Sequence, residues 1–295
     1  MRALVLGGTG LLGRVLLEEW SGDEITGIGS GDADIRDRSQ LRAYFHRCRP
    51  KWTVLAAAYT DVDGCEKEGR LAHDVNATGA ANVALECREV DSRLLFVSTD
   101  YVFDGAKSVP YEINDEMNRF SVYGESKAEG ERLVRGILPQ ACIVRTSWLF
   151  GANGRCFPNT ILNAAGTGKK LSVVDDQMGR PTYNRDLARA IIKLCRAGAQ
   201  EIVHASNSGS CSWYEFARYL LRAAGFADLP VEAIPTEALS HPARRPKRSV
   251  LSLASLEQYD IQMRPWQDTV ADYIRERTAL HGSHQPIPPR IAKTA

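Results

Sequence analysis

The sequence predicts an α/β protein built on a parallel β-sheet that helices cover on both faces. Short apolar runs rich in β-branched residues alternate with longer amphipathic segments, and this alternation is typical of such a sheet. A glycine-rich turn directly follows the first apolar run. At 295 residues, the chain is long enough for one large domain or for two unequal ones. We therefore predict a Rossmann-type doubly wound sheet with a smaller C-terminal lobe.

The expected elements follow one another in order along the chain. Strands are predicted by the apolar runs at residues 3–6, 52–58, 93–99 and 142–148, and by the start of the segment 24–37. Amphipathic segments separate these runs. A helix over 187–197, a strand over 201–206 and a helix over 213–225 that ends at a glycine come next. The alternation weakens after about residue 150, and residues 229–249 are rich in proline and arginine.

Composition narrows the classes of function. A net charge of +1 gives no reason to expect a nucleic-acid partner, and no apolar stretch approaches the about 20 residues of a membrane span. The seven cysteines are scattered without a CxxC pair, which suits a reducing compartment. Neither the six histidines nor the cysteines show metal-ligand spacing. We therefore expect a cytoplasmic protein with a small-molecule ligand and no metal, and the sequence leaves a homodimer open.

The stretch GGTGLLG (7–13) is the first candidate site. Gly7, Gly10 and Gly13 lie between a strand and a helix, where a tight turn and close approach to a pyrophosphate require missing side chains. The pattern predicts a dinucleotide site with contacts from Gly7, Gly10, Leu11, Leu12 and Gly13. The predicted organisation is thus an NAD(P)-binding domain over 1–150, to which 183–206 return, a substrate-binding lobe over 151–280 and a loose tail over 281–295.

The end of the second strand bears on the choice of cofactor. Dinucleotide sites usually place an acidic residue there to hold the adenosine ribose, but this chain has Gly29, Ser30 and Gly31. This favours NADPH over NADH, with Arg14 or Arg36 as the partner of the additional phosphate. Asp34 and Ile35 follow as candidate contacts of the adenine.

Tyr123 and Lys127 in SVYGESK form the second candidate site. Four residues apart, they share one face of a helix. Free tyrosine has a pKa of about 10, and a nearby ammonium group favours the phenolate and lowers that pKa. The pair therefore predicts an acid tuned for proton transfer, although such a spacing alone is more often a surface tyrosine beside a lysine.

With this pair, the chain resembles the extended short-chain dehydrogenase/reductase superfamily, in which a serine or threonine at a strand end completes the site. Thr99, at the end of RLLFVST, matches that position. Further stretches resemble the dTDP-4-dehydrorhamnose reductase family within it: AAAYTDVDGCE (56–66), STDYVFDG (98–105), VYGESKAEGE (122–131), RTSW (145–148), DQMGRPT (176–182) and RPKRS (245–249). One departure is Leu11, where the family often has a glutamine.

The resemblance implies NAD(P)H-dependent reduction of the 4-keto group of dTDP-4-dehydro-β-L-rhamnose to dTDP-L-rhamnose. It implies that Thr99, Tyr123 and Lys127 are catalytic, the last two also touching the cofactor. The remaining cofactor contacts that it implies are Ala56, Ala57, Ala58, Tyr59 and Asn76. The substrate contacts that it implies are Val62, Thr99, Tyr101, Trp148, Gln177 and Arg245, with Arg244 and Arg248 competing for the diphosphate.

Two other classes stay open at this stage. A related 4-keto-6-deoxy sugar-nucleotide reductase or a 4-epimerase would use the same groups, whereas a dehydratase would need a glutamate where Tyr101 stands. A non-catalytic NADP-binding subunit, similar to the regulatory subunit of methionine adenosyltransferase, would share the fold without turnover.

Overall fold

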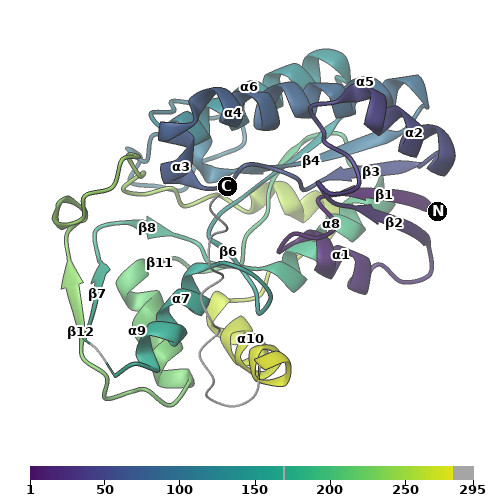
Figure 1. The fold of residues 1–295 in the computed structure, drawn as a ribbon. Coiled ribbons are helices and arrows are strands. Elements are labelled where there is room, and N and C mark those ends of the chain that lie inside the picture. The colour runs from purple at the N-terminus through teal and green to yellow at the C-terminus, as the bar shows by residue number, and fades with distance from the viewer. Residues whose placement is uncertain (169, 282–295) are drawn as a thin grey trace.

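The structure, a computed structural model, describes residues 1–168 and 170–281. Its centre is a parallel six-stranded sheet in the order β10-β5-β4-β3-β1-β2 (Figure 1). The chain adds β2 on one side of β1 and then returns to add β3 and the later strands on the other side, as in a doubly wound fold. The strands are β1 (Arg2–Leu6), β2 (Glu24–Ile28), β3 (Trp52–Leu55), β4 (Arg93–Thr99), β5 (Cys142–Thr146) and β10 (Ile202–His204).

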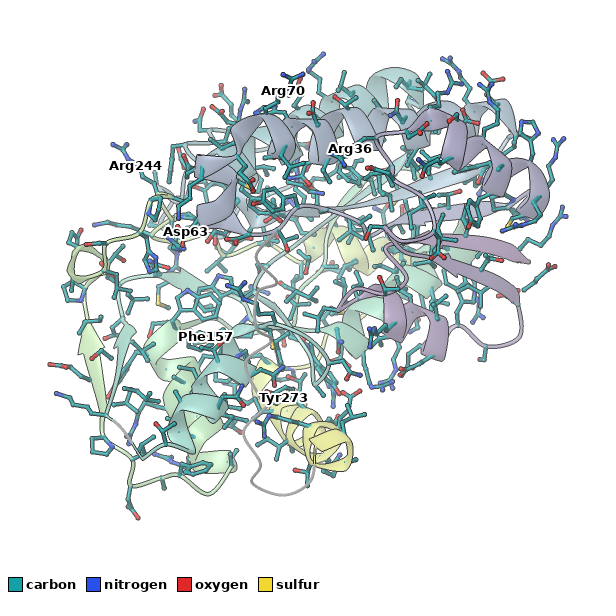
Figure 2. The ribbon with its side chains drawn as sticks, in the orientation of Figure 1. Arg36, Asp63, Arg70, Phe157, Arg244 and Tyr273 are labelled. Atoms are coloured by element: carbon teal, nitrogen blue, oxygen red, sulfur yellow. The ribbon has the colours of Figure 1, made fainter. Side chains whose placement is uncertain are left out.

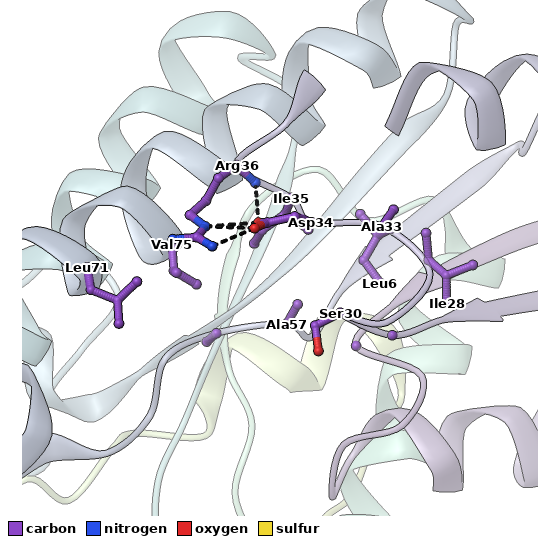
Figure 3. A pocket seen from close by; sticks show the side chains of 13 residues that line it. Leu6, Ile28, Ser30, Ala33, Asp34, Ile35, Arg36, Ala57, Leu71 and Val75 are labelled. Atoms are coloured by element: carbon purple, nitrogen blue, oxygen red, sulfur yellow. Dashed lines mark hydrogen bonds and ion pairs between the residues drawn. The ribbon is translucent and has the colours of Figure 1, made fainter. Parts of the chain in front are cut away.

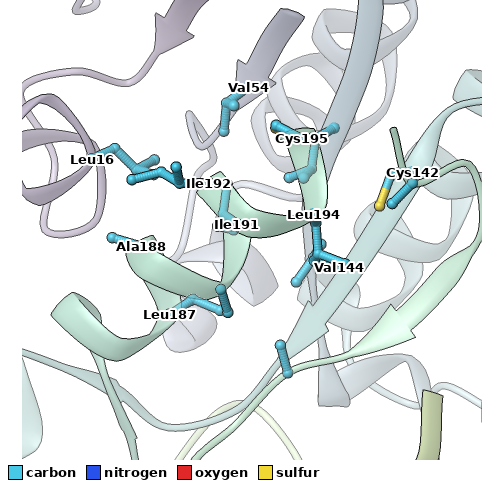
Figure 4. Close-up of a cluster of buried hydrophobic side chains, with 14 of the residues drawn as sticks. Leu16, Val54, Cys142, Val144, Leu187, Ala188, Ile191, Ile192, Leu194 and Cys195 are labelled. Carbon is cyan, nitrogen blue, oxygen red and sulfur yellow. The ribbon is translucent and has the colours of Figure 1, made fainter. Parts of the chain in front are cut away.

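Helices cover both faces of this sheet because neighbouring strand residues point to opposite sides. Ala3 and Val5 pack with α1 (Gly13–Glu19) and α8 (Asn184–Ala197). Figure 4 shows the side chains of α8 in the same cluster as Val54 of β3 and Val144 of β5. Leu4 and Leu6 pack with the other layer. That layer consists of α2 (Arg38–Cys48), α5 (Ala80–Glu89) and α6 (Val122–Ile137). Each fully buried aliphatic or aromatic side chain contributes roughly 1.5–3 kcal/mol.

A second hydrophobic cluster lies in the C-terminal half, below the sheet in Figure 1. Phe150, Phe216 and Trp266 are at its centre. Its helices are α7 (Phe157–Ala165), α9 (Trp213–Ala223) and α10 (Trp266–His281). Its short strands and turns are β6 (Leu149–Phe150), β7 (Leu171–Val174), β8 (Met178–Gly179), β9 (Thr182–Tyr183), β11 (Cys211–Ser212), β12 (Val231–Ile234) and η3 (Thr236–Ala238).

Short helices connect the strands at the carboxyl edge of the sheet. They are α3 (Val62–Lys67), α4 (Gly69–His73), the π-helix η1 (Asp74–Gly79), the 3₁₀-helix η2 (Asp100–Val102) and, further on, η4 (Ala254–Tyr259). None of the helices within 1–168 and 170–281 is long and apolar enough to cross a membrane.

Most expected elements are confirmed, with two shorter strands. The run 52–58 leaves the sheet after Leu55, because Ala56 to Ala58 pass over the strand ends. The run 142–148 ends at Thr146, since Trp148 adopts a positive φ of 46° that turns the chain toward β6. The expected helix 213–225 ends as predicted, with Gly225 at φ 85° just past α9. The predicted tail over 281–295 lies, except for His281, outside the described residues, and the division at residue 150 stays a prediction.

Candidate active site

The glycine turn lies where β1 and β3 end. Gly7 has φ 91°, and a Cβ added there would lie 2.6 Å from the backbone nitrogen of Ala57, so no other residue fits. The amides of Gly7 and Gly8 both donate to the carbonyl of Ile28 at 2.9 Å. The turn is thereby fixed against β2 and β3 at the switch point of the sheet, where such folds bind ligands.

A pocket of about 200 Å³ opens at this edge (Figure 3). Small or apolar residues from four segments form its wall, and Ser30, Asp34 and Arg36 supply polar groups. Its lining consists of Leu6, Gly7, Ile28, Gly29, Ser30, Ala33, Asp34, Ile35, Arg36, Ala57, Ala58, Leu71 and Val75. The pocket combines glycines without side chains, apolar side chains and a polar rim, and this combination fits the adenosine end of a dinucleotide.

Of the predicted cofactor contacts, Gly7, Asp34, Ile35, Ala57 and Ala58 line this pocket. The others lie beside it. The Leu12 side chain is buried in the core, whereas the Leu11 carbonyl accepts a hydrogen bond from Asn184 Nδ2 at 2.8 Å. Ala56 packs partly buried against the core, while Gly10 is exposed and Gly13 begins α1.

The polar rim of the pocket contains a close ion pair. Arg36 donates from Nε and Nη2 to the carboxylate of Asp34, and the shortest distance is 2.6 Å (Figure 3). Arg36 holds the pKa of Asp34 below its usual range. The side chains of Arg36 and Asp34 are 44% and 35% exposed, so the pair contributes little to stability. Arg14, the other predicted phosphate partner, is not among the lining residues and donates to the carbonyl of Thr9.

Asn76 joins the pocket to the helix that holds Tyr123. Its Oδ1 accepts from the amide of Tyr59 at 2.8 Å, and its Nδ2 donates to the Tyr59 carbonyl and to Ser126 Oγ, both at 3.0 Å. Ser126 in turn donates to the carbonyl of Tyr123. The side chain is buried on a π-helix, a distortion frequent at functional sites. Its whole amide is thus used to position Tyr59 and α6.

Tyr123 and Lys127 both lie on the buried face of α6, as predicted. The helix begins with Ser121, whose side chain accepts from the amide of Gly124. A Cβ on Gly124 would lie 2.2 Å from the carbonyl of Tyr101, so this glycine permits the close approach of η2. The side chain of Thr99, at the end of β4, acts on the Tyr123 hydroxyl to lower its pKa. Helix α6 therefore places the phenol at the same sheet edge as the pocket.

Lys127 is 2% exposed and packs on β4. Its Nζ donates to the carbonyl of Val97 at 2.8 Å and lies 4.0 Å from the centre of the Phe96 ring. Burial lowers the pKa of Lys127 to about 7, and the charge of Glu131, one turn further along α6, acts against this. The ammonium is held in place by β4 and not by Tyr123.

The expectation that Lys127 lowers the pKa of Tyr123 is wrong for this structure. Burial raises the pKa of Tyr123 above its ordinary value, while the hydrogen bond from Thr99 acts to lower it. The phenol is protonated at neutral pH and can donate its proton, but the raised pKa makes it a weaker acid than free tyrosine. Sequence spacing could not reveal the burial that sets this pKa.

The predicted substrate contacts lie around the ends of β4 and β5. Tyr101 packs edge-on against Tyr123 with ring centroids 5.5 Å apart, and Val62 is in the same small cluster. Trp148 stacks on Trp213 at 3.5 Å, so one ring face is already covered. Gln177 is buried and donates to Thr236 Oγ1. These contacts bring Val62 and Tyr101 to Tyr123, and they tie Trp148 and Gln177 to the C-terminal lobe.

Arg245, predicted for the diphosphate, is already paired. Its Nη2 donates to Asp63 Oδ2 at 2.7 Å, and His241 lies 3.3 Å from the same oxygen. Asp63 belongs to α3, and Figure 2 shows it on the side of the molecule where Arg244 also lies. The guanidinium of Arg245 is therefore partly neutralised by a carboxylate that the sequence prediction missed.

Arg180 and Arg248 differ from Arg245 in having no acidic partner. Among the residues that the structure describes, neither side chain makes an ion pair, and the Nε of each is buried without a hydrogen-bond partner. Their backbone segments lie side by side, because the Met178 amide donates to the carbonyl of Lys247 and the Met178 carbonyl accepts from the amide of Ser249. Both side chains are half-buried and lack a carboxylate partner among the described residues, which marks them as a candidate anion site.

Comparison with known proteins gives a consistent result. The model of the RmlD substrate binding domain family matches residues 1–279. The spore coat polysaccharide biosynthesis protein SpsK of Bacillus subtilis is 38% identical, over 94% of this chain and 98% of its own. A dTDP-4-keto-6-deoxy-D-glucose reductase of Streptomyces niveus is 37% identical, over 85% and 88%.

A solved structure has the same fold at similar identity. It is the dTDP-4-dehydrorhamnose reductase of Bacillus anthracis in complex with NADP. It is 36% identical, with a TM-score of 0.89 over 93% of this chain and 99% of the other.

Proposed function

Because this chain belongs to the RmlD substrate binding domain family, we propose that it reduces the 4-keto group of dTDP-4-dehydro-β-L-rhamnose to give dTDP-L-rhamnose. NADPH or NADH is the reductant, as the similarity to an NADP complex supports. The observation that carries the proposal is that Tyr123, Thr99 and Lys127 are buried together at the sheet edge that forms the pocket.

Bound NAD(P)H supplies a hydride to C4 of the sugar. Tyr123 donates its phenolic proton to the carbonyl oxygen as that oxygen gains negative charge, and Thr99 donates a hydrogen bond to the same oxygen. Lys127, which lies on α6 with its ammonium group against β4, would hold a ribose hydroxyl of the cofactor. The buried setting strengthens each of these contacts because the surroundings are of low dielectric constant.

The diphosphate of the substrate is assigned to Arg180 and Arg248. Both belong to segments beside Trp148: Arg180 accepts from Ser147 Oγ through its carbonyl, and Arg248 lies next to β8. Thr146 is the register partner of Thr99 across β4 and β5, so these segments begin next to the catalytic threonine. Arg245 contributes less to phosphate binding, because Asp63 already neutralises part of its charge.

The 2′-phosphate of NADPH is assigned to Arg36 and Ser30 at the rim of the pocket. No acidic residue occupies positions 29–31 to repel that phosphate. Asp34 already pairs with Arg36, so binding of NADPH exchanges the carboxylate for the 2′-phosphate as the partner of the guanidinium. NADH, which lacks this phosphate, is the weaker cofactor.

The function is tested by incubating the purified protein with NADPH and dTDP-4-dehydro-β-L-rhamnose. The expected result is one NADPH oxidised for each dTDP-L-rhamnose formed. An epimerase would change the sugar without net NADPH consumption, and a regulatory subunit would bind NADPH without turnover. The 4-keto-6-deoxy-D-glucose nucleotide, named for the Streptomyces niveus relative, serves as the competing substrate.

A further inference from the structure

Asp100 is a buried acid that the proposed reaction does not yet use. It follows Thr99 directly and is 1% exposed. Its Oδ1 accepts from the Thr99 hydroxyl at 3.2 Å, and its Oδ2 accepts from the Ser249 hydroxyl. The carboxyl group therefore lies between the catalytic threonine and the segment 245–249, which carries Arg245 and Arg248.

No cation within the described residues neutralises Asp100. Its surroundings are hydroxyl groups, and burial raises the pKa of this carboxyl to about 7, while Ser249 and Thr99 act to lower it. The charge of Asp100 acts on two titratable groups packed beside it, Tyr101 of η2 and Tyr123 of α6. Helix α6 also carries Lys127 and Glu131, helix α3 carries Asp63 and Cys65, and the 245–249 segment carries Arg245, Lys247 and Arg248. Burial thus favours the protonated carboxyl more than in an exposed aspartate.

The protonation of Asp100 decides where the single proton of Thr99 points. Thr99 Oγ1 already accepts from the amide of Tyr101 at 3.2 Å. When Asp100 is ionised, the Thr99 hydroxyl donates to it and has no proton left for a substrate oxygen. When Asp100 is protonated, it donates to Thr99, and the threonine proton is free to turn toward the substrate.

We propose that Asp100 is a positioning residue for the reduction: in its protonated form it directs the Thr99 hydroxyl toward the reacting carbonyl oxygen, with Ser249 holding the second oxygen of the carboxyl group. The inference rests on the proposed function, since the carbonyl is that of the sugar nucleotide.

The segment that holds Ser249 is fixed on both sides. The Ser249 amide donates to the carbonyl of Met178 at 3.0 Å, and the Arg248 amide donates to the carbonyl of Gly105 at 3.2 Å. Asp100 is therefore tied to the backbone segment that presents Arg248, so the groups assigned to the diphosphate and to the carbonyl share one hydrogen-bonded frame.

The test is the pH dependence of the single-turnover rate of NADPH oxidation with dTDP-4-dehydro-β-L-rhamnose. In the unchanged protein, Asp100 must be protonated, so its ionisation adds about one to the slope with which the logarithm of the rate falls on the alkaline side. In Asp100→Asn, whose amide donates to Thr99 at every pH, the slope is smaller by about one. Asp104→Asn, which removes a nearby carboxylate that binds Tyr111, keeps the steeper limb.

Ser249→Ala gives a second readout that does not depend on the Asn variant folding. Loss of its hydroxyl removes a group that stabilises ionised Asp100, so the alkaline inflection moves to higher pH. An unchanged slope in Asp100→Asn, or an unmoved inflection in Ser249→Ala, overturns the role of Asp100 while the reductase stands. Absence of turnover in the unchanged protein overturns the proposed function and this inference with it.

Discussion

The two ends of the candidate site are built in different ways. The pocket at the glycine turn is formed by backbone, small residues and an exposed ion pair between Asp34 and Arg36. The other end holds Thr99, Tyr123 and Lys127, each less than a tenth exposed. Binding of the nucleotide therefore depends on shape and surface charge, whereas the reaction depends on groups whose pKa values are set by burial.

The difference matters for what mutations do. At the pocket, a lost side chain is replaced by water and only one contact to the cofactor disappears. At the buried end, a lost partner leaves a polar group without a hydrogen bond, which costs about 1–3 kcal/mol. We therefore expect large effects on the rate from the buried end and selective effects on cofactor affinity from the pocket.

The largest effect is expected from Tyr123→Phe. Loss of the phenolic proton should lower kcat by roughly 10³-fold, since general acid catalysis typically contributes 10² to 10⁴. Affinity for NADPH, measured by fluorescence titration, should stay within about twofold because the ring remains. Tyr183→Phe, which removes a buried hydroxyl bonded to Glu276 in the other lobe, should leave kcat near that of the unchanged protein. A comparable loss in both variants would show a general structural effect.

A smaller effect, on KM for the substrate, is expected from Arg180 and Arg248, which make no ion pair among the described residues. Arg180→Ala and Arg248→Ala should each raise KM for the sugar nucleotide about 10-fold or more, because each removes a charged contact to phosphate. Arg244→Ala, at an exposed neighbour, should change KM little. Steady-state kinetics measure the comparison, and a larger effect from Arg244 than from Arg248 would contradict the assignment.

The pocket offers a selective change. Arg36→Ala should weaken NADPH binding about 10-fold and leave NADH binding nearly the same, because only NADPH carries the phosphate assigned to Arg36. Arg14→Ala serves as the matched control, since Arg14 is outside the pocket lining. Equal losses for the two cofactors in Arg36→Ala would place the phosphate elsewhere.

The smallest effect is one of stability against pH. The native pKa of Asp100 is raised to about 7, above its value in the unfolded chain, so the folded state binds the proton more tightly. Its contribution to the free energy of unfolding is complete at low pH and is lost as pH rises through the native pKa. Asp100→Asn should lose less stability than the unchanged protein between about pH 4 and 7 in denaturant titrations. Parallel curves would exclude a protonated Asp100.

Local features of the site could be predicted from the sequence. Gly7 follows from its place in a strand-turn-helix pattern, and Tyr123 and Lys127 follow from helical spacing, so each prediction uses residues close in the chain. Thr99 needed the resemblance to a known superfamily. The limits of the sheet strands were missed by one to three residues where the chain turns over the sheet edge, as at Trp148.

The missed features join distant parts of the chain. The pairing of Asp63 with Arg245 spans 182 positions, and that of Asp100 with Ser249 spans 149, so no periodicity could reveal either. Leu71 and Val75 line the pocket from α4 and η1, and their spacing of four residues was the only available signal. The pKa of Tyr123 depends on burial, which the order of residues alone does not give.

The most direct test follows the hydride itself. The protein is incubated with NADPH that carries deuterium at both C4 positions of the nicotinamide and with dTDP-4-dehydro-β-L-rhamnose, and the sugar product is examined by mass spectrometry and NMR. The account predicts one deuterium at C4 of dTDP-L-rhamnose for each NADPH oxidised. A product without deuterium at C4, or unchanged substrate beside bound NADPH, would contradict it.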